Sequence, residues 1–416
     1  MATVHESTKP GRPADARQSL PDGAVLACFA ALGMATLAYD LAIGLPLRIA
    51  DHNWLGMDFV NMWFGARLAW AGDLATLFDW PRYMAYVRGI AGPDYPLHNW
   101  SYPPHVLLFV WPLARLDYGP ALLLWNGLGY LAYALALRTL FAARAIRPSP
   151  MRFALAFVAP GAIANIVFGH VGLFVTALFA AGMAWRDRRP WLAGLMFGLM
   201  TMKPHLGAVV PILLLAERRW TVIVSAGLST AVLVAITSAV FGWSVFPDYL
   251  RQVGPVQTAI LMTEVGLEHL SPTWFAGIRT WNLAPEWGWP VLAVTAPLGI
   301  LAVVLAVRRD LPPVRRDLVI ALAAFMVTPY AFLYDLALTV PFLAVYLGLA
   351  STSRARTLAV LALLSPLLPP VTTHLPIPLT PIILTAMLVE ALFGEALSDA
   401  AAGADTPAGS DQRVRA

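Results

Sequence analysis

Long apolar stretches separated by short polar segments run along almost the whole chain. A helix that crosses the hydrocarbon core of a bilayer needs about 20 apolar residues, and several stretches are shorter, so we expect tilted, broken or re-entrant helices among them. The pattern predicts an all-α, polytopic transmembrane helical bundle with about ten to thirteen membrane helices. The apolar stretches run from Ala24 to Leu47 and over about 104–116, 119–142, 153–168, 170–185, 191–216, 220–241, 288–307, 317–332, 335–350, 357–370 and 376–394.

The composition agrees with a membrane protein. Hydrophobic residues make up 59% of the 416 residues, only 12% are charged, and the mean hydropathy is +0.67. A soluble domain carries about 25% charged residues. We expect a basic tail over 1–22, a single transmembrane domain over 23–396, and a polar tail over 397–416. The single cysteine, Cys28, excludes a disulfide framework and a thiolate metal site.

Basic residues indicate the orientation of the bundle. The first apolar stretch is longer than the core of a signal peptide, about 7 to 15 residues, so it predicts an uncleaved anchor behind a cytoplasmic N-terminus. The net charge of +4 and pI near 9.3 come from arginines in short loops. This distribution indicates that the basic residues set the orientation in the membrane and contact anionic lipid headgroups, rather than bind nucleic acid. Placing every cluster in the cytoplasm, with both termini, satisfies the positive-inside rule. The clusters are Arg138, Arg144, Arg147 and Arg152; Arg186, Arg188 and Arg189; Arg218 and Arg219; Arg308, Arg309, Arg315 and Arg316; and Arg354 and Arg356.

Most of the unusual polar groups then fall on the opposite, extracytoplasmic side. Polar groups at membrane depth are costly and usually line a cavity, so their gathering at one side predicts a functional site there. The outer segments are the loops over about 48–103 and 243–287 and the breaks at 165–170, 202–205, 328–335 and 369–378.

The first outer loop carries the leading candidate for chemistry, Asp58. The loop is rich in tryptophan and tyrosine, and we expect interfacial helices over 58–70 and 81–90, followed by a segment at 104–116 that enters the membrane without crossing it. The Asp58 carboxylate fits a catalytic role, but aspartate also caps helices well, so both interpretations stay open. No metal site around it has a diagnostic spacing.

A second group of candidates interrupts the later apolar stretches. Lys203 would cost about 2.5–3.5 kcal/mol if buried alone, so it either forms an anion site together with a helix that starts at Pro204, or snorkels to an interface. His170 is a candidate donor to a phosphate or hydroxyl, or a structural residue at a helix end. Asp335 could orient an acceptor, pair with Lys203, or cap the next helix.

The order of short motifs resembles glycosyltransferase family 87. Members of that family are polyprenyl-phosphate-sugar-dependent transferases of the GT-C class, and they include mannosyltransferases. The resemblance covers roughly residues 25–350. It is carried by Met57-Asp58-Phe59, Ala71-Gly72-Asp73 with Leu77-Phe78-Asp79, Tyr102-Pro103-Pro104, Trp111-Pro112-Leu113-Ala114, Gly169-His170, Met202-Lys203-Pro204-His205, Thr328-Pro329-Tyr330 and Tyr334-Asp335.

The resemblance implies a GT-C-like bundle in the plasma (inner) membrane that transfers a sugar from a polyprenyl phosphate to a lipid or glycan acceptor with inversion. Asp58 is then the general base, and no metal or other cofactor is required because the donor is already activated. Mannose is the family default, although Gly169-His170 and the segment from Thr328 to Asp335 depart from the family pattern. The expected donor-phosphate contacts are Lys203, His205 and His170, with Arg279 as a weaker candidate, and the expected substrate contacts are Asn61, Tyr102, Tyr330, Tyr334 and Asp335.

Two other membrane functions remain as alternatives. A lipid-linked-sugar flippase or other polytopic transporter also needs ionisable groups in a bundle, but it predicts inverted repeats, and none is evident. An oligosaccharide polymerase or ligase is expected to use paired arginines in a large outer loop, where this chain has only Arg251 and Arg279. Motifs for ATP hydrolysis, zinc proteases and serine hydrolases are missing from the sequence.

Overall fold

The computed structural model describes residue 31 and residues 56–93, 95–146, 150–263 and 267–395. The chain is a helical membrane protein, and no strand occurs in these ranges. The expected anchor from Ala24 to Leu47 and both tails lie outside the described residues. In the described part, three helices are long and apolar enough to cross a membrane: α6 (Tyr118–Ala143), α12 (Trp220–Phe241), and α16 (Gly288–Arg308) with the short turn before it.

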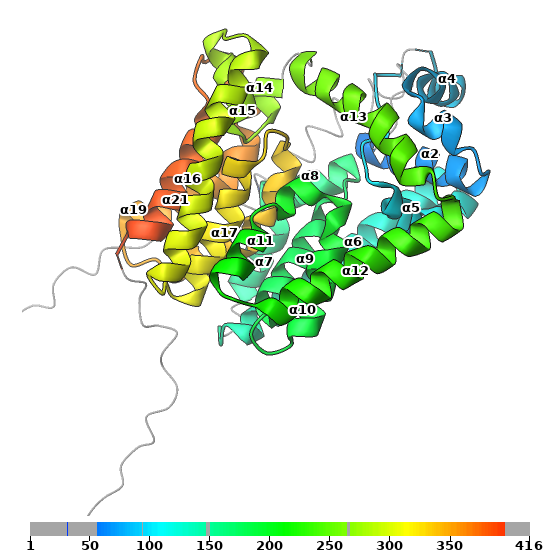
Figure 1. Cartoon of the computed structure of the whole chain (residues 1–416). Helices are drawn as coiled ribbons and strands as arrows, with labels where there is room; N and C mark the ends of the chain where they lie inside the picture. The colour runs from blue at the N-terminus through cyan, green and yellow to red at the C-terminus, as the bar shows by residue number, and fades with distance from the viewer. Residues whose placement is uncertain (1–30, 32–55, 94, 147–149, 264–266, 396–416) are drawn as a thin grey trace, which may run out of the picture.

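The first outer loop folds into a layer of short helices, at the right of Figure 1. α2 is buried on nearly every side, which differs from a helix that lies flat on the membrane, because α3, α5 and η2 all pack against it. α4 keeps one buried and one exposed face. The segment at 104–116 consists of three short turns, in keeping with a segment too short to cross. The elements are α2 (Met57–Trp70), α3 (Leu74–Phe78), α4 (Trp80–Ala91), η1 (Pro104–Val106), α5 (Leu107–Val110) and η2 (Trp111–Arg115).

The second outer loop packs against the first. The hydroxyl of Tyr249 donates to the carbonyl of Ser101 over 2.9 Å, and the amide of Asn99 donates to Gln257 over 3.3 Å. The first part of the second loop, α13, therefore lies against the first loop, whereas α15 packs on α16 and α21. The second loop contains α13 (Val245–Thr263), α14 (Leu267–Leu270), α15 (Trp274–Gly277), η5 (Ile278–Trp281) and η6 (Pro285–Trp287).

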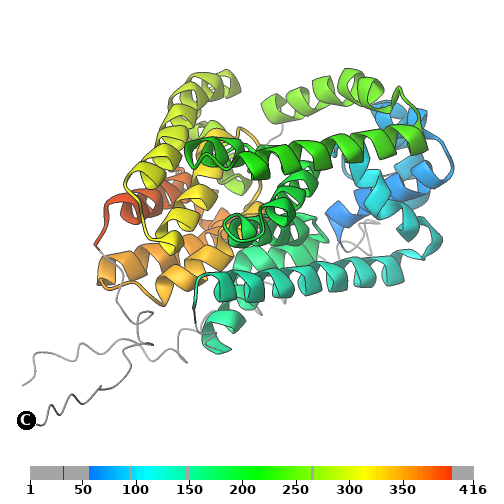
Figure 2. The same ribbon diagram turned by 60° about the horizontal axis from the view of Figure 1, so that its bottom comes forward.

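The middle of the bundle is built on small residues that allow helices to approach closely. α9 packs between α6 and α10, and α10 packs along α12 (Figure 2). A Cβ atom on Gly194 would lie 2.7 Å from the carbonyl oxygen of Val222, and one on Gly198 would lie 2.6 Å from the Cβ of Ser229. Glycines at this spacing set the α10–α12 contact. The other elements here are α7 (Pro150–Val158), α8 (Pro160–Phe168), α9 (Gly172–Trp185), α10 (Pro190–Leu199), η3 (Met200–Met202), η4 (Pro204–Gly207) and α11 (Val210–Ala216).

The last third of the chain forms a second group of helices, drawn yellow to red in Figure 1. α17 is its centre, because it contacts α16, α18 and α21. The short turn η7 faces the middle group and packs on α8 and α9. The elements after α16 are α17 (Pro313–Val327), η7 (Leu333–Leu338), α18 (Val340–Leu347), α19 (Ser353–Leu364), η8 (Ser365–Leu367), α20 (Pro369–Thr372) and α21 (Leu379–Phe393).

Ion pairs join the arginine-rich loops at one end of the bundle. Asp317, near the start of α17, accepts from Nε of Arg144 over 2.7 Å and forms an ion pair with Arg186 at 3.1 Å. Glu217 bridges Arg186 at 3.1 Å and Arg316 at 3.4 Å. The sequence indicated the arginines but not these two carboxylates. The network shows that loops assigned to one side of the membrane do meet at one end of the fold.

Candidate functional site

Three breaks in the apolar sequence meet around the ammonium of Lys203. Lys203 lies between η3 and η4, is buried, and forms an ion pair with Asp335. Its Nζ lies 3.1 Å from Nε2 of His170 and 5.2 Å from the ring centre of Tyr334. Lys203 therefore does not snorkel to an interface, because its charge is compensated inside the protein.

Asp335 combines two of the roles considered from the sequence. Its Oδ1 pairs with Lys203, and its Oδ2 accepts the backbone N–H of Phe332 over 2.9 Å. The second bond holds the first turn of η7, where Asp335 is the third residue rather than the N-cap. A buried carboxylate with both oxygens engaged has a fixed position, so it can hold Lys203 in one orientation.

His170 is anchored to the fold by one ring nitrogen and by stacking. Its Nδ1 accepts the backbone N–H of Gly172 over 3.0 Å, and its ring stacks on Tyr334 with centroids 3.8 Å apart. The other nitrogen is the one that faces Lys203. The ring is thus a packed part of the site rather than a surface group at a helix end.

Asn165 positions this cluster, a role that sequence reasoning did not assign. Its side-chain amide donates to the carbonyl of Tyr334 over 2.9 Å and to the carbonyl of Gly161 over 2.8 Å. A Cβ atom on Gly161 would lie 3.1 Å from the backbone nitrogen of Ala337, so glycine allows α8 to lie directly on η7. An asparagine inside an apolar stretch was the signal that could have identified it, because a polar side chain there needs hydrogen-bond partners.

Asp58 reaches the same region from α2. Gly56, not Asp58, is the N-cap of that helix, and it is in the left-handed conformation with φ of 77°. Asp58 is the second helical residue and is half-buried. Its charge contributes to the electrostatics of Lys203, Tyr102 and Tyr334, so the carboxylate lies in the same region of the fold.

Close packing of a turn against α2 explains why Asp58 lies there. Gly169 ends α8 with φ of 61°, and a Cβ atom on it would lie 2.5 Å from the Cβ of Phe59. Trp125 donates from its indole nitrogen to the carbonyl of Gly169 over 3.0 Å. The turn that carries His170 and the helix that carries Asp58 are therefore in direct contact.

Aromatic side chains complete the surroundings of Asp58 and Lys203. Tyr102 is buried, and burial, followed by the charge of Asp58, raises the pKa of its phenol well above the usual value of 10.0. Its hydroxyl is therefore a permanent hydrogen-bond donor. Tyr330 meets His205 edge to face, with ring centres 5.9 Å apart. Nε2 of His205 is buried and has no hydrogen-bond partner among the described residues.

The structure contains the expected helix start and places two residues elsewhere. Pro204 begins a 3-10 turn of four residues, and the apolar helical stretch that starts with it continues to Ala216. Asn61 lies one turn after Asp58, but its amide donates to the carbonyl of Asn99 over 2.8 Å and accepts from Tyr83. Arg279 donates to the carbonyl of Leu261 in the second outer loop. A substrate contact by Asn61 or Arg279 stays a prediction.

The model of glycosyltransferase family 87 matches residues 100–329 of this chain. That match covers more than half of the sequence. The chain belongs to glycosyltransferase family 87. No curated protein and no solved structure matches it.

The family match includes only part of the candidate site of this glycosyltransferase. Tyr102, His170, Lys203 and His205 lie inside the matched residues. Asp58 lies before them, and Tyr330, Tyr334 and Asp335 lie just after. The fold joins Asp335 to Lys203, Tyr334 to His170 and Tyr330 to His205. It also packs α2, which carries Asp58, against the turn before His170.

Proposed function

We propose that this family 87 glycosyltransferase moves a sugar from a polyprenyl-phosphate donor to a hydroxyl of a lipid or glycan acceptor, with inversion, using Asp58 as general base. The observation that carries the proposal is that the turn before His170, whose ring lies 3.1 Å from the Lys203 ammonium, packs directly on α2, the helix that carries Asp58. Transfer from a sugar phosphate needs a proton acceptor on one side of the anomeric carbon and a cation on the other.

The proposed step is a single displacement. The acceptor oxygen forms a bond to the anomeric carbon, and its proton passes to the Asp58 carboxylate. The bond between the anomeric carbon and the phosphate oxygen breaks, and its electron pair stays with the departing polyprenyl phosphate. Attack and departure on opposite faces of the sugar invert the anomeric configuration. Because the donor is an activated phosphodiester, we propose that no metal ion takes part.

Lys203 is the proposed partner of the phosphate. An ammonium has three donors, and Asp335 and His170 lie at only two positions around it. The charge of Lys203 is shared with Asp335, so the free Nε2 of His205 is a second proposed contact for the phosphate. Nδ1 of His170 accepts the N–H of Gly172, so Nε2 carries the ring proton and His170 lies beside the ammonium without accepting from it. Tyr102 offers a phenolic donor to the sugar or the acceptor.

The setting follows from the chain's topology. We propose a plasma (inner) membrane location with the site facing the periplasm or cell exterior, because the arginine-rich loops meet at the other end of the bundle. Mannose is the default sugar by family, and the other hexoses and the pentoses remain compatible with the residues described.

The experiment that tests the function is transfer from a synthetic polyprenyl-phosphate sugar by the purified protein. We expect Asp58→Asn to abolish transfer nearly completely while donor binding is retained, because the amide keeps the shape but cannot accept a proton. Asp73→Asn is the matched control, since Asp73 only caps α3 by accepting the N–H of Thr76 over 3.0 Å. Undiminished turnover by Asp58→Asn would contradict the assignment of the base. Donor translocation without a glycosidic product would instead favour a flippase.

A further inference from the structure

His105 is a buried histidine of the first outer loop that has no role in the proposed reaction so far. It is the middle residue of the short turn η1, and only 4% of it is exposed. Pro103 and Pro104 separate it from Tyr102, and their rings restrict the backbone dihedrals between the two side chains. A contact made by His105 therefore also restrains the segment that carries Tyr102.

The ring of His105 makes one hydrogen bond of defined direction. The hydroxyl of Thr201 donates to the carbonyl of Gly198 over 2.6 Å, and this bond uses its single proton. Nε2 of His105 lies 3.3 Å from the same hydroxyl oxygen, so this nitrogen carries the ring proton and donates it. Burial lowers the pKa of His105 from 6.5 to about 4, so Nδ1 is unprotonated at neutral pH. Nδ1 is buried and has no hydrogen-bond partner among the described residues, so the bond to Thr201 sets the orientation of the ring.

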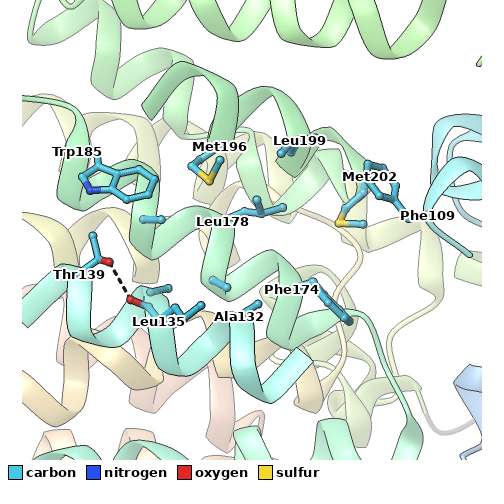
Figure 3. A pocket seen from close by; sticks show the side chains of 13 residues that line it. Phe109, Ala132, Leu135, Thr139, Phe174, Leu178, Trp185, Met196, Leu199 and Met202 are labelled. Carbon is cyan, nitrogen blue, oxygen red and sulfur yellow. Dashed lines mark hydrogen bonds between the residues drawn. The ribbon is translucent and has the colours of Figure 1, made fainter. Parts of the chain in front are cut away.

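Thr201 belongs to the turn that directly precedes Lys203. This turn, η3, follows α10, and the backbone N–H of Lys203 donates to the carbonyl of Met200 within it over 3.0 Å. The neighbouring residue of the turn also faces the first outer loop, because Met202 and Phe109 of α5 line the same end of an apolar pocket of about 290 Å³ (Figure 3). The first outer loop therefore reaches the turn before Lys203 at two places.

The second outer loop packs on His105 as well. The ring of Phe246, in α13, lies with its centroid 6.3 Å from that of His105, and the two ring planes are 26° apart. η1 as a whole contacts both α12 and α13. An imidazole packed in this way has little freedom to rotate, so its N–H can hold Thr201 in one place.

We propose that His105 is a positioning residue for sugar transfer, which fixes the η3 turn relative to the first outer loop through its hydrogen bond to Thr201. The inference rests on the proposed function, which places the donor's phosphate at Lys203 and the proton acceptor in the first outer loop. Displacement at the anomeric carbon needs these groups at a defined separation, and misplacement by about 1 Å can lower a rate by about a hundredfold. His105 acts here only through the position of Lys203 relative to Asp58 and Tyr102.

Paired substitutions at the two partners test the hydrogen bond. We expect His105→Phe, which keeps a ring against Phe246, and Thr201→Val each to lower kcat by about tenfold or more, with KM for the donor changed by less than about twofold. The double variant should be no slower than the slower single variant, because both substitutions remove the same contact. His105→Gln keeps a donor and Thr201→Ser keeps an acceptor, so each should recover most of the rate.

Thr139→Val is the matched control for Thr201→Val. It also removes a hydroxyl that donates to a carbonyl of its own helix, that of Leu135 over 2.8 Å, but outside the candidate site (Figure 3). Its kcat should stay within about twofold of the wild-type value. Wild-type kcat in Thr201→Val, or equal losses in His105→Phe and His105→Gln, would overturn the inference. Thr201→Val decides the matter if His105→Phe does not fold.

Hydrogen exchange gives a readout that needs no sugar transfer. In lipid nanodiscs without substrate, the backbone N–H groups of residues 200–207 should exchange faster in His105→Phe and Thr201→Val than in the wild type, whereas Thr139→Val should match the wild type. Unchanged exchange in the first two variants would overturn the inference. If exchange rises but the wild-type protein transfers no sugar, the positioning of the turn stands and the proposed function fails. If transfer depends on Asp58 but not on His105, only this inference fails.

Discussion

Lys203 and Asp335 form a buried pair in which neither charge is stable alone. Removing one partner leaves an uncompensated charge, which costs about 3–5 kcal/mol, whereas replacing both with apolar residues of similar volume is often tolerated. Removing one charge of this pair is therefore expected to affect the stability of the protein as well as sugar transfer.

We expect Lys203→Met and Asp335→Leu each to lower the free energy of unfolding by about 3–5 kcal/mol, and the double variant to recover most of that loss. Transfer should stay abolished in the double variant, because the proposed phosphate contact is gone. Thermal unfolding in detergent and a transfer assay measure the two effects separately. Additive destabilisation in the double variant would show that the pair is not coupled.

Tyr102 permits a test by pH. Burial and the charge of Asp58 both favour the neutral phenol and so raise its pKa above 10.0. The neutral Tyr102 phenol therefore contributes its full share to the stability of the folded protein below pH 10.0, and this contribution is lost only at higher pH. Tyr102→Phe should lower transfer through loss of a donor, but the pH profiles of variant and wild type should run parallel from pH 7 to 10. A fall in the wild type alone below pH 10.0 would contradict the raised pKa.

At the scale of elements, the site depends on helices that end or approach each other at glycines. The turn between α8 and α9 is the clearest case, because it touches α2 at Phe59 and carries His170 on the next position. Shifting this turn moves Asp58 and His170 apart without changing either residue.

We expect Gly169→Ala to reduce stability by more than about 1 kcal/mol, since its φ of 61° is unfavourable for alanine and its Cβ would meet Phe59. Transfer per folded molecule should fall more than donor binding does, because the base is displaced. Gly227→Ala in α12 is the control, because a Cβ there meets nothing within 4 Å, and it should be neutral or slightly stabilising. Equal effects of the two substitutions would contradict a positioning role for the turn.

At the scale of the whole molecule, the fold has two polar ends. α9 connects them: it starts two residues after His170 and ends beside Arg186, which is bound to Asp317 and Glu217. Its 14 residues span about 21 Å. The candidate site and the arginine network are thus separated by most of the bundle's depth.

The orientation of these ends is testable by labelling. In a Cys28→Ser background, Ala75→Cys at the layer of short helices should react with a membrane-impermeant maleimide added to intact cells or spheroplasts. Arg188→Cys, which is equally exposed but lies at the arginine-rich end, should react only after the membrane is opened. The reverse pattern would place the site in the cytoplasm.

Hydrophobic patterning determined the class of this protein and indicated two residues of the candidate site. Long apolar stretches leave few alternatives to a helical bundle, and a charged residue inside one must be compensated, so Lys203 and Asp335 were identifiable as candidates from the sequence. Asp58 was suspected from its place in the first outer loop and from the order of motifs. The helix over 57–70 was also predictable, within one residue of its start.

Only the tertiary structure decided which polar groups compensate each other. Lys203 pairs with Asp335, which lies 132 residues away along the chain, and Asn165 donates to the carbonyl of Tyr334, which lies 169 residues away. The burial of α2 and the ion pairs of Asp317 and Glu217 depend in the same way on contacts between distant segments. Local periodicity records how apolar each position is, but pairing energies depend on distance in space, and only the packed helices set that distance.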